Sequence, residues 1–171
     1  MTEVETGQAT QDAPWLTPEQ QQEWRALMEL VTVLPGAIDV QLRRDAGINT
    51  FEYQILAVLS SQPRCTQGLS DLAAAVLGSP SRLSHALTRL QRAGWVERRD
   101  CTELGGRRAE ATLTEGGLAK IRDTAPGHVR EVRRLVVDTL TAAELEALGA
   151  IARKIVAGPV AADVHVCTEQ S

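Results

Sequence analysis

Hydrophobic residues recur at steps of three and four over most of the chain, and this spacing predicts α-helices. The first helix should begin at Thr17-Pro18-Glu19-Gln20, which combines a capping residue, a proline at the first helical position and a glutamine that can return a hydrogen bond to the cap. Its apolar positions are Leu27, Val31, Leu34, Ile38 and Leu42. Pro35-Gly36 lies inside this stretch, so we expect a kink or a local break there.

Shorter helices follow, each bounded by residues that start or stop a helix. They are predicted at about residues 51–61, 69–76 and 79–93. Leu77-Gly78 forms the tight turn before the last of these helices, which Ser79 and Pro80 begin and Gly94 ends. The apolar residues of this helix fall on one face and are Leu83, Ala86, Leu87 and Leu90. That face is expected to pack on the preceding helix.

The period then changes to the alternation typical of β-strands. Trp95–Arg98 and Ala109–Leu113 flank a Gly105-Gly106 turn, which predicts a hairpin. Helical spacing resumes over residues 114–138 and again over 141–158, and Thr141-Ala142-Ala143-Glu144 has the pattern of a capping box at the start of the last helix. The chain is therefore expected to have a mainly α fold with a small β-hairpin wing, in the order of a winged helix-turn-helix domain combined with further helices.

Composition supports a folded, helical protein and excludes several classes. Hydrophobic residues make up 43% of the chain and aromatic residues only 3%, so aliphatic side chains must build the core. No apolar run approaches the roughly 20 residues of a membrane span. The N-terminus is acidic and polar, unlike a signal peptide, so we expect a cytoplasmic protein with no membrane partner. Cys65, Cys101 and Cys167 are odd in number and far apart, which argues against a disulfide framework.

The charge distribution changes the meaning of the net charge. The whole chain carries −4, which by itself argues against nucleic acid. Residues 64–108, however, hold eight arginines against four acidic residues, whereas the remainder holds 10 basic and 18 acidic residues. A local basic segment on an acidic protein is the electrostatic pattern of a phosphate binder. Double-stranded DNA is therefore the expected partner.

The candidate DNA-binding residues lie on the polar face of the 79–93 helix and on the hairpin. They are Ser79, Ser81, Arg82, Ser84, His85, Thr88, Arg89, Arg92, Arg98, Arg99, Arg107 and Arg108. Helical spacing places Arg82, His85, Arg89 and Arg92 in one stripe. We expect Arg82 and His85 to contact bases, and Arg89, Arg98 and Arg99 mainly to hold phosphates. Arg107-Arg108 at the hairpin tip is expected to reach a minor groove.

The same residues resemble the MarR family of bacterial transcriptional regulators. The matching segments are Leu72-Ala73, Ser79-Pro80-Ser81-Arg82-Leu83-Ser84, Arg89-Leu90, Gly94-Trp95-Val96-Glu97-Arg98, Arg107-Arg108-Ala109 and Leu113-Thr114-Glu115-Gly116-Gly117. The resemblance implies a homodimer that represses from palindromic sites, with a small aromatic or other ligand between the domains that releases DNA. The sequence departs from the family pattern at Gly106, where many members carry an aspartate that orients the first wing arginine.

This resemblance divides the chain into regions. They are a disordered tail (1–16), a helical dimerisation region (17–46 and 114–158), a winged helix-turn-helix domain (47–113) and a loose tail (159–171). Trp15, Trp24 and Tyr53 are candidates for lining a ligand pocket, although aromatic residues in helices more often belong to the core.

Other functions have weaker support in the sequence. There is no phosphate-binding glycine loop, nucleophile elbow or close carboxylate pair, so no enzyme and no cofactor is expected. A redox- or metal-responsive sensor of the same fold stays open as an alternative. Cys101 lies beside Arg98 and Arg99, but an inert thiol is the simpler interpretation, and the spacing of His85, His128 and His165 does not suggest a metal site. A dimeric interaction module without DNA binding is the other alternative, and the intact arginine stripe argues against it.

Overall fold

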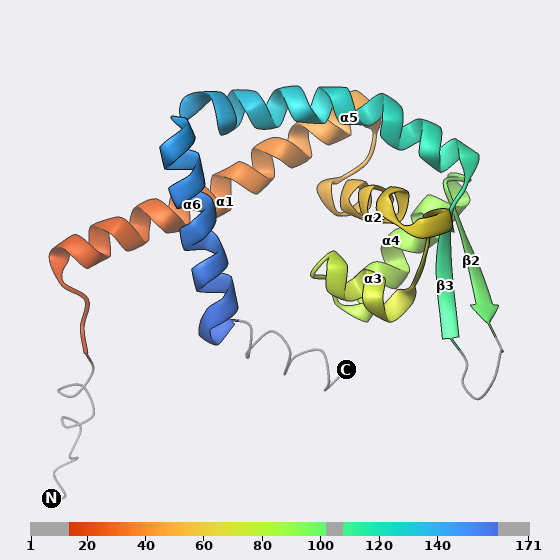
Figure 1. Ribbon diagram of the computed structural model, residues 1–171, viewed down its shortest axis with the longest axis horizontal. Coiled ribbons are helices and arrows are strands. Elements are labelled where there is room, and N and C mark those ends of the chain that lie inside the picture. Colours follow the sequence, from red (N-terminus) through yellow and green to blue (C-terminus); the bar gives the residue numbers. More distant parts are fainter. Residues whose placement is uncertain (1–13, 102–107, 161–171) are drawn as a thin grey trace, which may run out of the picture. The chain divides into compact units, whose positions relative to one another are not determined.

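The computed structural model describes residues 14–101 and 108–160, so the predicted tails at 1–13 and 161–171 lie outside the described residues (Figure 1). The chain divides into two units, Met1–Gly36 and Ala37–Ser171, and each is described by itself. The helices are α1 (Pro18–Ala46), α2 (Thr50–Ser61), α3 (Leu69–Ala75), α4 (Pro80–Arg92), α5 (Glu115–Leu135) and α6 (Ala142–Ile155). The strands are β1 (Thr66–Gly68), β2 (Val96–Cys101) and β3 (Arg108–Leu113). Single turns of 3-10 or π helix occupy Pro63–Cys65, Val137–Thr139 and Val156–Val160.

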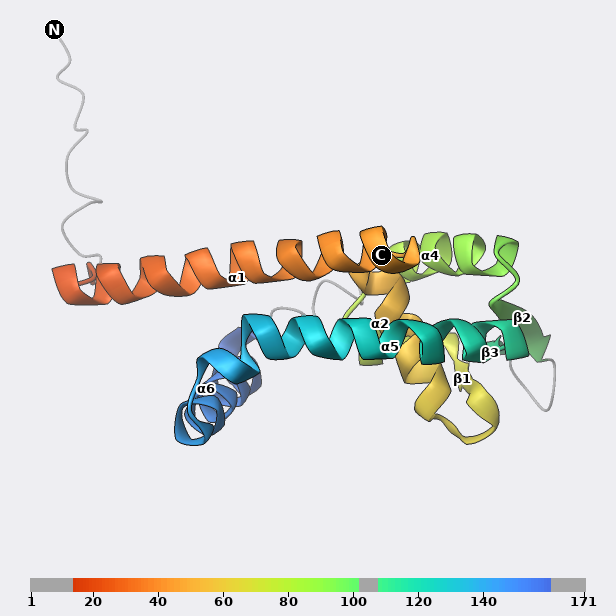
Figure 2. The ribbon, with the colours of Figure 1, turned by 90° about the horizontal axis from the view of Figure 1, so that it is seen from above.

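The predicted start of α1 is confirmed, but the predicted break is wrong. The Thr17 backbone N–H donates to Gln20 Oε1 at 2.9 Å, and the Gln20 N–H donates to Thr17 Oγ1 at 3.2 Å. The helix then runs unbroken through Pro35 to Ala46, and Figure 2 shows it as one ribbon. Pro35 removes only one backbone hydrogen bond, and it is exposed, so water can solvate the carbonyl that it leaves free.

The core of the second unit joins the three helices of the winged helix domain to the sheet. Its largest fully buried side chains include Ile55, Leu56 and Leu59 of α2, Leu72 of α3 and Leu87 and Leu90 of α4. The face of α4 predicted to pack inward is buried in full, because Leu83, Ala86, Leu87 and Leu90 are each no more than 2% exposed. Asn49 caps α2 through a reciprocal pair of hydrogen bonds with Glu52, at 2.9 Å each.

The predicted hairpin forms part of a larger sheet. The strand order is β1-β3-β2 and both pairings are antiparallel, with Val96 opposite Leu113 and Arg98 opposite Ala111. Strand β1 was not predicted, because three residues are too few to show a strand period. The Thr66 and Thr112 hydroxyls lie 2.9 Å apart and hydrogen-bond across its pairing with β3.

Helix α5 is anchored at its N-terminus to the end of α4. The Thr114 hydroxyl accepts the Gly117 N–H at 3.0 Å and donates to the Gly94 carbonyl at 2.7 Å. Helix α5 continues through Pro126 and ends at Leu135, a few residues before the predicted limit. The capping box predicted at Thr141 is present and begins α6. The first turn of α5 therefore fixes where α4 ends and the wing begins.

Two adjacent glycines test this junction. A Cβ added at Gly117 would lie 2.1 Å from the Trp95 carbonyl oxygen and 2.7 Å from Leu113 Cδ1, whereas one at Gly116 would meet nothing closer than 3.5 Å. We expect Gly117→Ala to lower the free energy of unfolding by about 2–3 kcal/mol, because backbone at the β2 junction must move. Gly116→Ala is expected to be neutral or slightly stabilising, since alanine favours helix. Urea unfolding of the two variants measures the difference, and equal stabilities would contradict the packing described.

Candidate nucleic-acid interface

The turn before α4 places the start of that helix at the protein surface. Leu77, which is 80% exposed, has a φ of +49°, so the left-handed conformation falls on Leu77 and not on Gly78. Gly78 is required for space instead, because a Cβ there would lie 2.5 Å from Phe51 Cζ. The Ser79 hydroxyl then accepts the Arg82 N–H at 3.3 Å and caps α4. The predicted turn and helix start are thus present.

The polar face of α4 has a centre and a flank. With Leu83, Ala86, Leu87 and Leu90 buried, a period of 3.6 residues places Ser81, His85, Thr88 and Arg92 opposite the core. Thr88 is half-buried and its hydroxyl donates to the Ser84 carbonyl at 2.9 Å, while the other three are exposed. Arg82 and Arg89 lie on the flank, beside the buried face. The predicted stripe therefore divides into two outward residues, His85 and Arg92, and two residues that contact α2.

Both flank arginines are held by the first turn of α2. The Arg82 guanidinium carbon lies 4.1 Å from the centre of the Phe51 ring. Arg89 Nε donates to Glu52 Oε1 at 2.6 Å. Neither Phe51 nor Glu52 was a predicted site residue. Glu52 carries a recognisable local signal as the third residue after the Asn49 cap, but nothing in the sequence indicates its distant arginine partner.

The two arginines of β2 lie on opposite sides of the hairpin. Strand alternation puts Arg98 on the side of buried Val96, and Arg98 is itself half-buried. Arg99 is exposed on the other side, where it contacts Glu97 at 3.2 Å. Arg108 begins β3 opposite Cys101, while Arg107 and Gly106 lie outside the described residues. The winged helix thus presents α4 and Arg99 to solvent.

A cavity of about 350 Å³ lies in the second unit. Its walls include Ile38 of α1, Thr50 and Tyr53 of α2, and His128 and Val132 of α5. The Tyr53 and His128 rings stack in a tilted arrangement with centres 4.3 Å apart. Burial lowers the pKa of His128 and raises the pKa of Tyr53, so both side chains favour their neutral forms.

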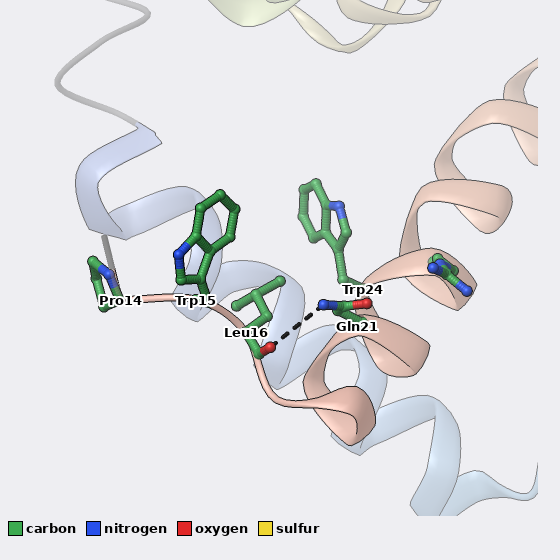
Figure 3. Close-up of a pocket in the computed structure, with 6 residues that line it drawn as sticks. Pro14, Trp15, Leu16, Gln21 and Trp24 are labelled. Carbon is green, nitrogen blue, oxygen red and sulfur yellow. Dashed lines mark hydrogen bonds between the residues drawn. The ribbon is translucent and has the colours of Figure 1, made fainter. Parts of the chain in front are cut away.

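The wall of this cavity is also tied to α1. The Asp39 carboxylate accepts the Thr50 N–H at 2.9 Å, and this hydrogen bond is the main reason that the pKa of Asp39 lies below its ordinary value. His128 Nδ1 is buried and has no hydrogen-bond partner among the described residues. The other candidate aromatics, Trp15 and Trp24, line a separate, open hollow of about 520 Å³ in the first unit (Figure 3).

The remaining sensor chemistry has little support among residues 14–101 and 108–160. No three His, Cys, Asp or Glu side chains come together there as a metal site would need. Cys65 is half-buried and is not part of a disulfide, and the Cys101 side chain is not described. In the same part of the chain, no helix has the length and apolar character required to cross a membrane.

Comparison with known proteins places this geometry in a family. A family model for MarR proteins matches residues 48–103. The chain is 42% identical to Sco3205, a MarR family transcriptional regulator from Streptomyces coelicolor solved in complex with DNA, over 85% of this chain and 91% of that one, with a TM-score of 0.82. AbsC, a MarR family regulator from the same organism, is 35% identical over 90% and 99% of the two chains, with a TM-score of 0.77. This chain belongs to the MarR family.

A MarR family regulator from Silicibacter pomeroyi is 25% identical over 81% of this chain and 91% of that one, with a TM-score of 0.63. A search among curated proteins gave no match. MarR proteins are DNA-binding transcriptional regulators and not enzymes, so the predicted fold class, the regulatory function and the expectation that the chain is not an enzyme are confirmed.

Proposed function

We propose that this MarR protein acts as a homodimeric repressor that binds palindromic DNA, with one winged helix on each half-site. The observation that carries the proposal is α4, a capped helix with one face buried and Ser81, His85 and Arg92 exposed on the other. A helix of this kind fits the major groove, and two-fold symmetry spaces the half-sites about one helical turn apart. A dimer bound over a promoter excludes polymerase by occupancy, and the proposed location is the cytoplasm, where bacterial DNA lies.

The proposal divides the chain and its site residues by role. Residues 47–113 bind DNA, and residues 17–46 with 114–158 dimerise. Arg82 and His85, in the N-terminal half of α4, contact bases, because that end of a recognition helix enters the groove. Arg89, Arg92 and Arg99 hold phosphates. Arg107 and Arg108, which the sequence predicts at the tip of the hairpin, enter the minor groove.

Two arginine variants separate base contacts from phosphate contacts. We expect Arg82→Ala to cost about 1–3 kcal/mol on the preferred site and to relax preference at one base pair. Arg92→Ala should weaken binding to all sequences about equally and reduce the salt slope by about one per half-site. Fluorescence anisotropy at several salt concentrations measures both effects, using promoter fragments from beside the gene and random DNA.

Arg153→Ala is the matched control, because Arg153 is an exposed arginine of α6, outside the winged helix. It should leave affinity and salt slope unchanged. If Arg82→Ala alters neither affinity nor preference, Arg82 does not contact bases. If no promoter fragment outcompetes random DNA at physiological salt, the chain is not a site-specific repressor of its neighbouring genes.

The proposed dimer is supported by apolar surface that a single chain leaves uncovered. Every side chain from Pro14 to Val33 is exposed, including Trp24 and Leu30. On α6, Leu148, Ile151 and Ile155 form an apolar face that is 37–56% exposed. Contiguous apolar surface of this kind marks an interface, and homodimers bury it symmetrically. A second copy of this chain is the proposed partner.

A charge placed on the apolar face of α6 tests the dimer. We expect Ile151→Glu to yield monomers at micromolar concentration, because an unpaired carboxylate in an apolar interface costs several kcal/mol. Ala150→Glu puts the same charge on the polar face of α6 and should remain dimeric. Sedimentation equilibrium distinguishes the two states. Dimers of equal affinity in both variants would place the interface elsewhere.

The proposed effector site is the 350 Å³ cavity beside Tyr53 and His128. Its lining contains no Lys or Arg, and burial favours the neutral imidazole of His128. A buried carboxylate would find no counter-charge there, and its desolvation would be uncompensated. We therefore propose a neutral aromatic ligand of phenol type that weakens DNA binding.

Ligand charge provides the test of this site. At ten times its Kd, a neutral phenol is expected to stabilise the protein by about 1.4 kcal/mol and to reduce DNA affinity. A benzoate of the same size should have no effect at neutral pH. Thermal unfolding and DNA anisotropy with matched phenol and benzoate pairs measure this, and Tyr53→Ala should abolish the response. A benzoate that binds better than its phenol partner would contradict the proposal.

A further inference from the structure

Two adjacent residues of α2 contact the two flank arginines of the recognition helix. Phe51 and Glu52 lie in the first turn of α2 and are both buried, at 6% and 7% exposure. Their partners on α4, Arg82 and Arg89, are two helical turns apart. A single turn of α2 therefore holds both ends of the same flank of α4.

The contact with Glu52 fixes the direction of Arg89. Glu52 Oε2 accepts the Asn49 N–H at 2.9 Å and Oε1 accepts Arg89 Nε–H at 2.6 Å, so each carboxylate oxygen has a partner. The Arg89 side chain remains 57% exposed. Among the described residues no hydrogen bond involves its terminal nitrogens, which carry four N–H donors. Because the guanidinium is planar and rigid, holding Nε sets the direction of the free edge.

The contact with Phe51 acts on Arg82 in a different way. A guanidinium held over a ring is attracted through its charge, and this contact does not require a hydrogen bond from its N–H donors. The ring cannot easily shift, because its far edge packs against Gly78, where even a Cβ would not fit. Phe51 thus provides a fixed platform that orders a long side chain without using its donors.

We propose that Phe51 and Glu52 are positioning residues, which aim Arg82 and Arg89 at DNA before DNA arrives. The proposal rests on the proposed function, in which these two arginines contact DNA. Ordering the side chains in advance removes an entropic cost from binding. Glu52 also carries a negative charge close to the DNA-binding face. If that charge dominated, its removal would tighten binding to all DNA, which is the opposite of what positioning predicts.

Glu52→Gln tests the inference directly, because glutamine can keep the hydrogen bond to Asn49 and loses the ion pair. Specific and random binding should both weaken, by about three- to tenfold per half-site on the specific site, because Arg89 is proposed to hold a phosphate and phosphates are present on every sequence. In an Arg89→Lys background, which keeps the charge and loses the Nε contact, Glu52→Gln should have no further effect on specific binding. Asp71→Asn, which removes an exposed carboxylate of α3, is the charge control and should weaken neither specific nor random binding.

Variants of Phe51 test the inference independently of Glu52. Phe51→Leu should lower the preference at the base pair that Arg82 contacts, and Phe51→Tyr, which keeps the ring, should restore it. Thermal unfolding of each variant reports stability, and a loss of specificity with unchanged melting temperature supports positioning.

If Glu52→Gln tightens specific and random binding alike, as a charge effect would, the inference is overturned. If Arg89→Ala itself leaves specific binding unchanged, the proposed phosphate contact fails together with the inference. An effect of Arg89→Ala without any effect of Glu52→Gln overturns the inference alone.

Discussion

The packing of α4 on the core determines what this protein can present to DNA. Four side chains, Leu83, Ala86, Leu87 and Leu90, are buried in full. Burial of each leucine contributes about 1.5–3 kcal/mol, which exceeds the worth of any single polar contact on the same helix. The apolar face therefore sets the rotation of α4 about its axis. Once that rotation is set, His85 and Arg92 face outward and Arg82 and Arg89 are turned toward α2.

Polar contacts then refine what the apolar packing has set. A buried carboxylate such as Glu52 is costly to desolvate, and one ion pair with a half-exposed arginine offsets little of that cost. The Asn49 backbone N–H satisfies the second oxygen and ties the charge to the start of α2. The Glu52–Arg89 ion pair is thus poorly explained by a gain in net stability. The direction that it gives to the Arg89 guanidinium is a stronger reason, because a rigid group held at one nitrogen must present its other edge.

The first turn of α2 lies at the meeting point of several elements. Thr50 donates to Asp39 of α1, Phe51 and Glu52 hold the arginines of α4, and Tyr53 stacks on His128 of α5. Thr50 and Tyr53 also line the 350 Å³ cavity. A ligand in that cavity would therefore touch the same turn that contacts Arg82 and Arg89, which provides a short physical route between the two proposed sites.

The features predicted correctly from the sequence are those with a local cause. Caps at Thr17, Ser79 and Thr141 need only residues within one turn, and the buried face of α4 needs only its own period. Strand β1 was missed because three residues show no period, and the break at Pro35 was wrong because an exposed helix tolerates one lost hydrogen bond. The candidate α4 residues lie together on one helix as predicted, yet their division into centre and flank was not foreseen.

The sequence by itself determined that this chain forms a winged helix with basic residues on the polar face of α4, because periodicity, capping and local charge are all properties of neighbouring residues. Only the tertiary structure decided which arginines are free and which are held. Glu52 and Arg89 are 37 positions apart, and their contact depends on how α2 and α4 cross. Helical spacing gives the order of side chains around one helix. Which residues of α2 those side chains meet depends on how the two helices pack.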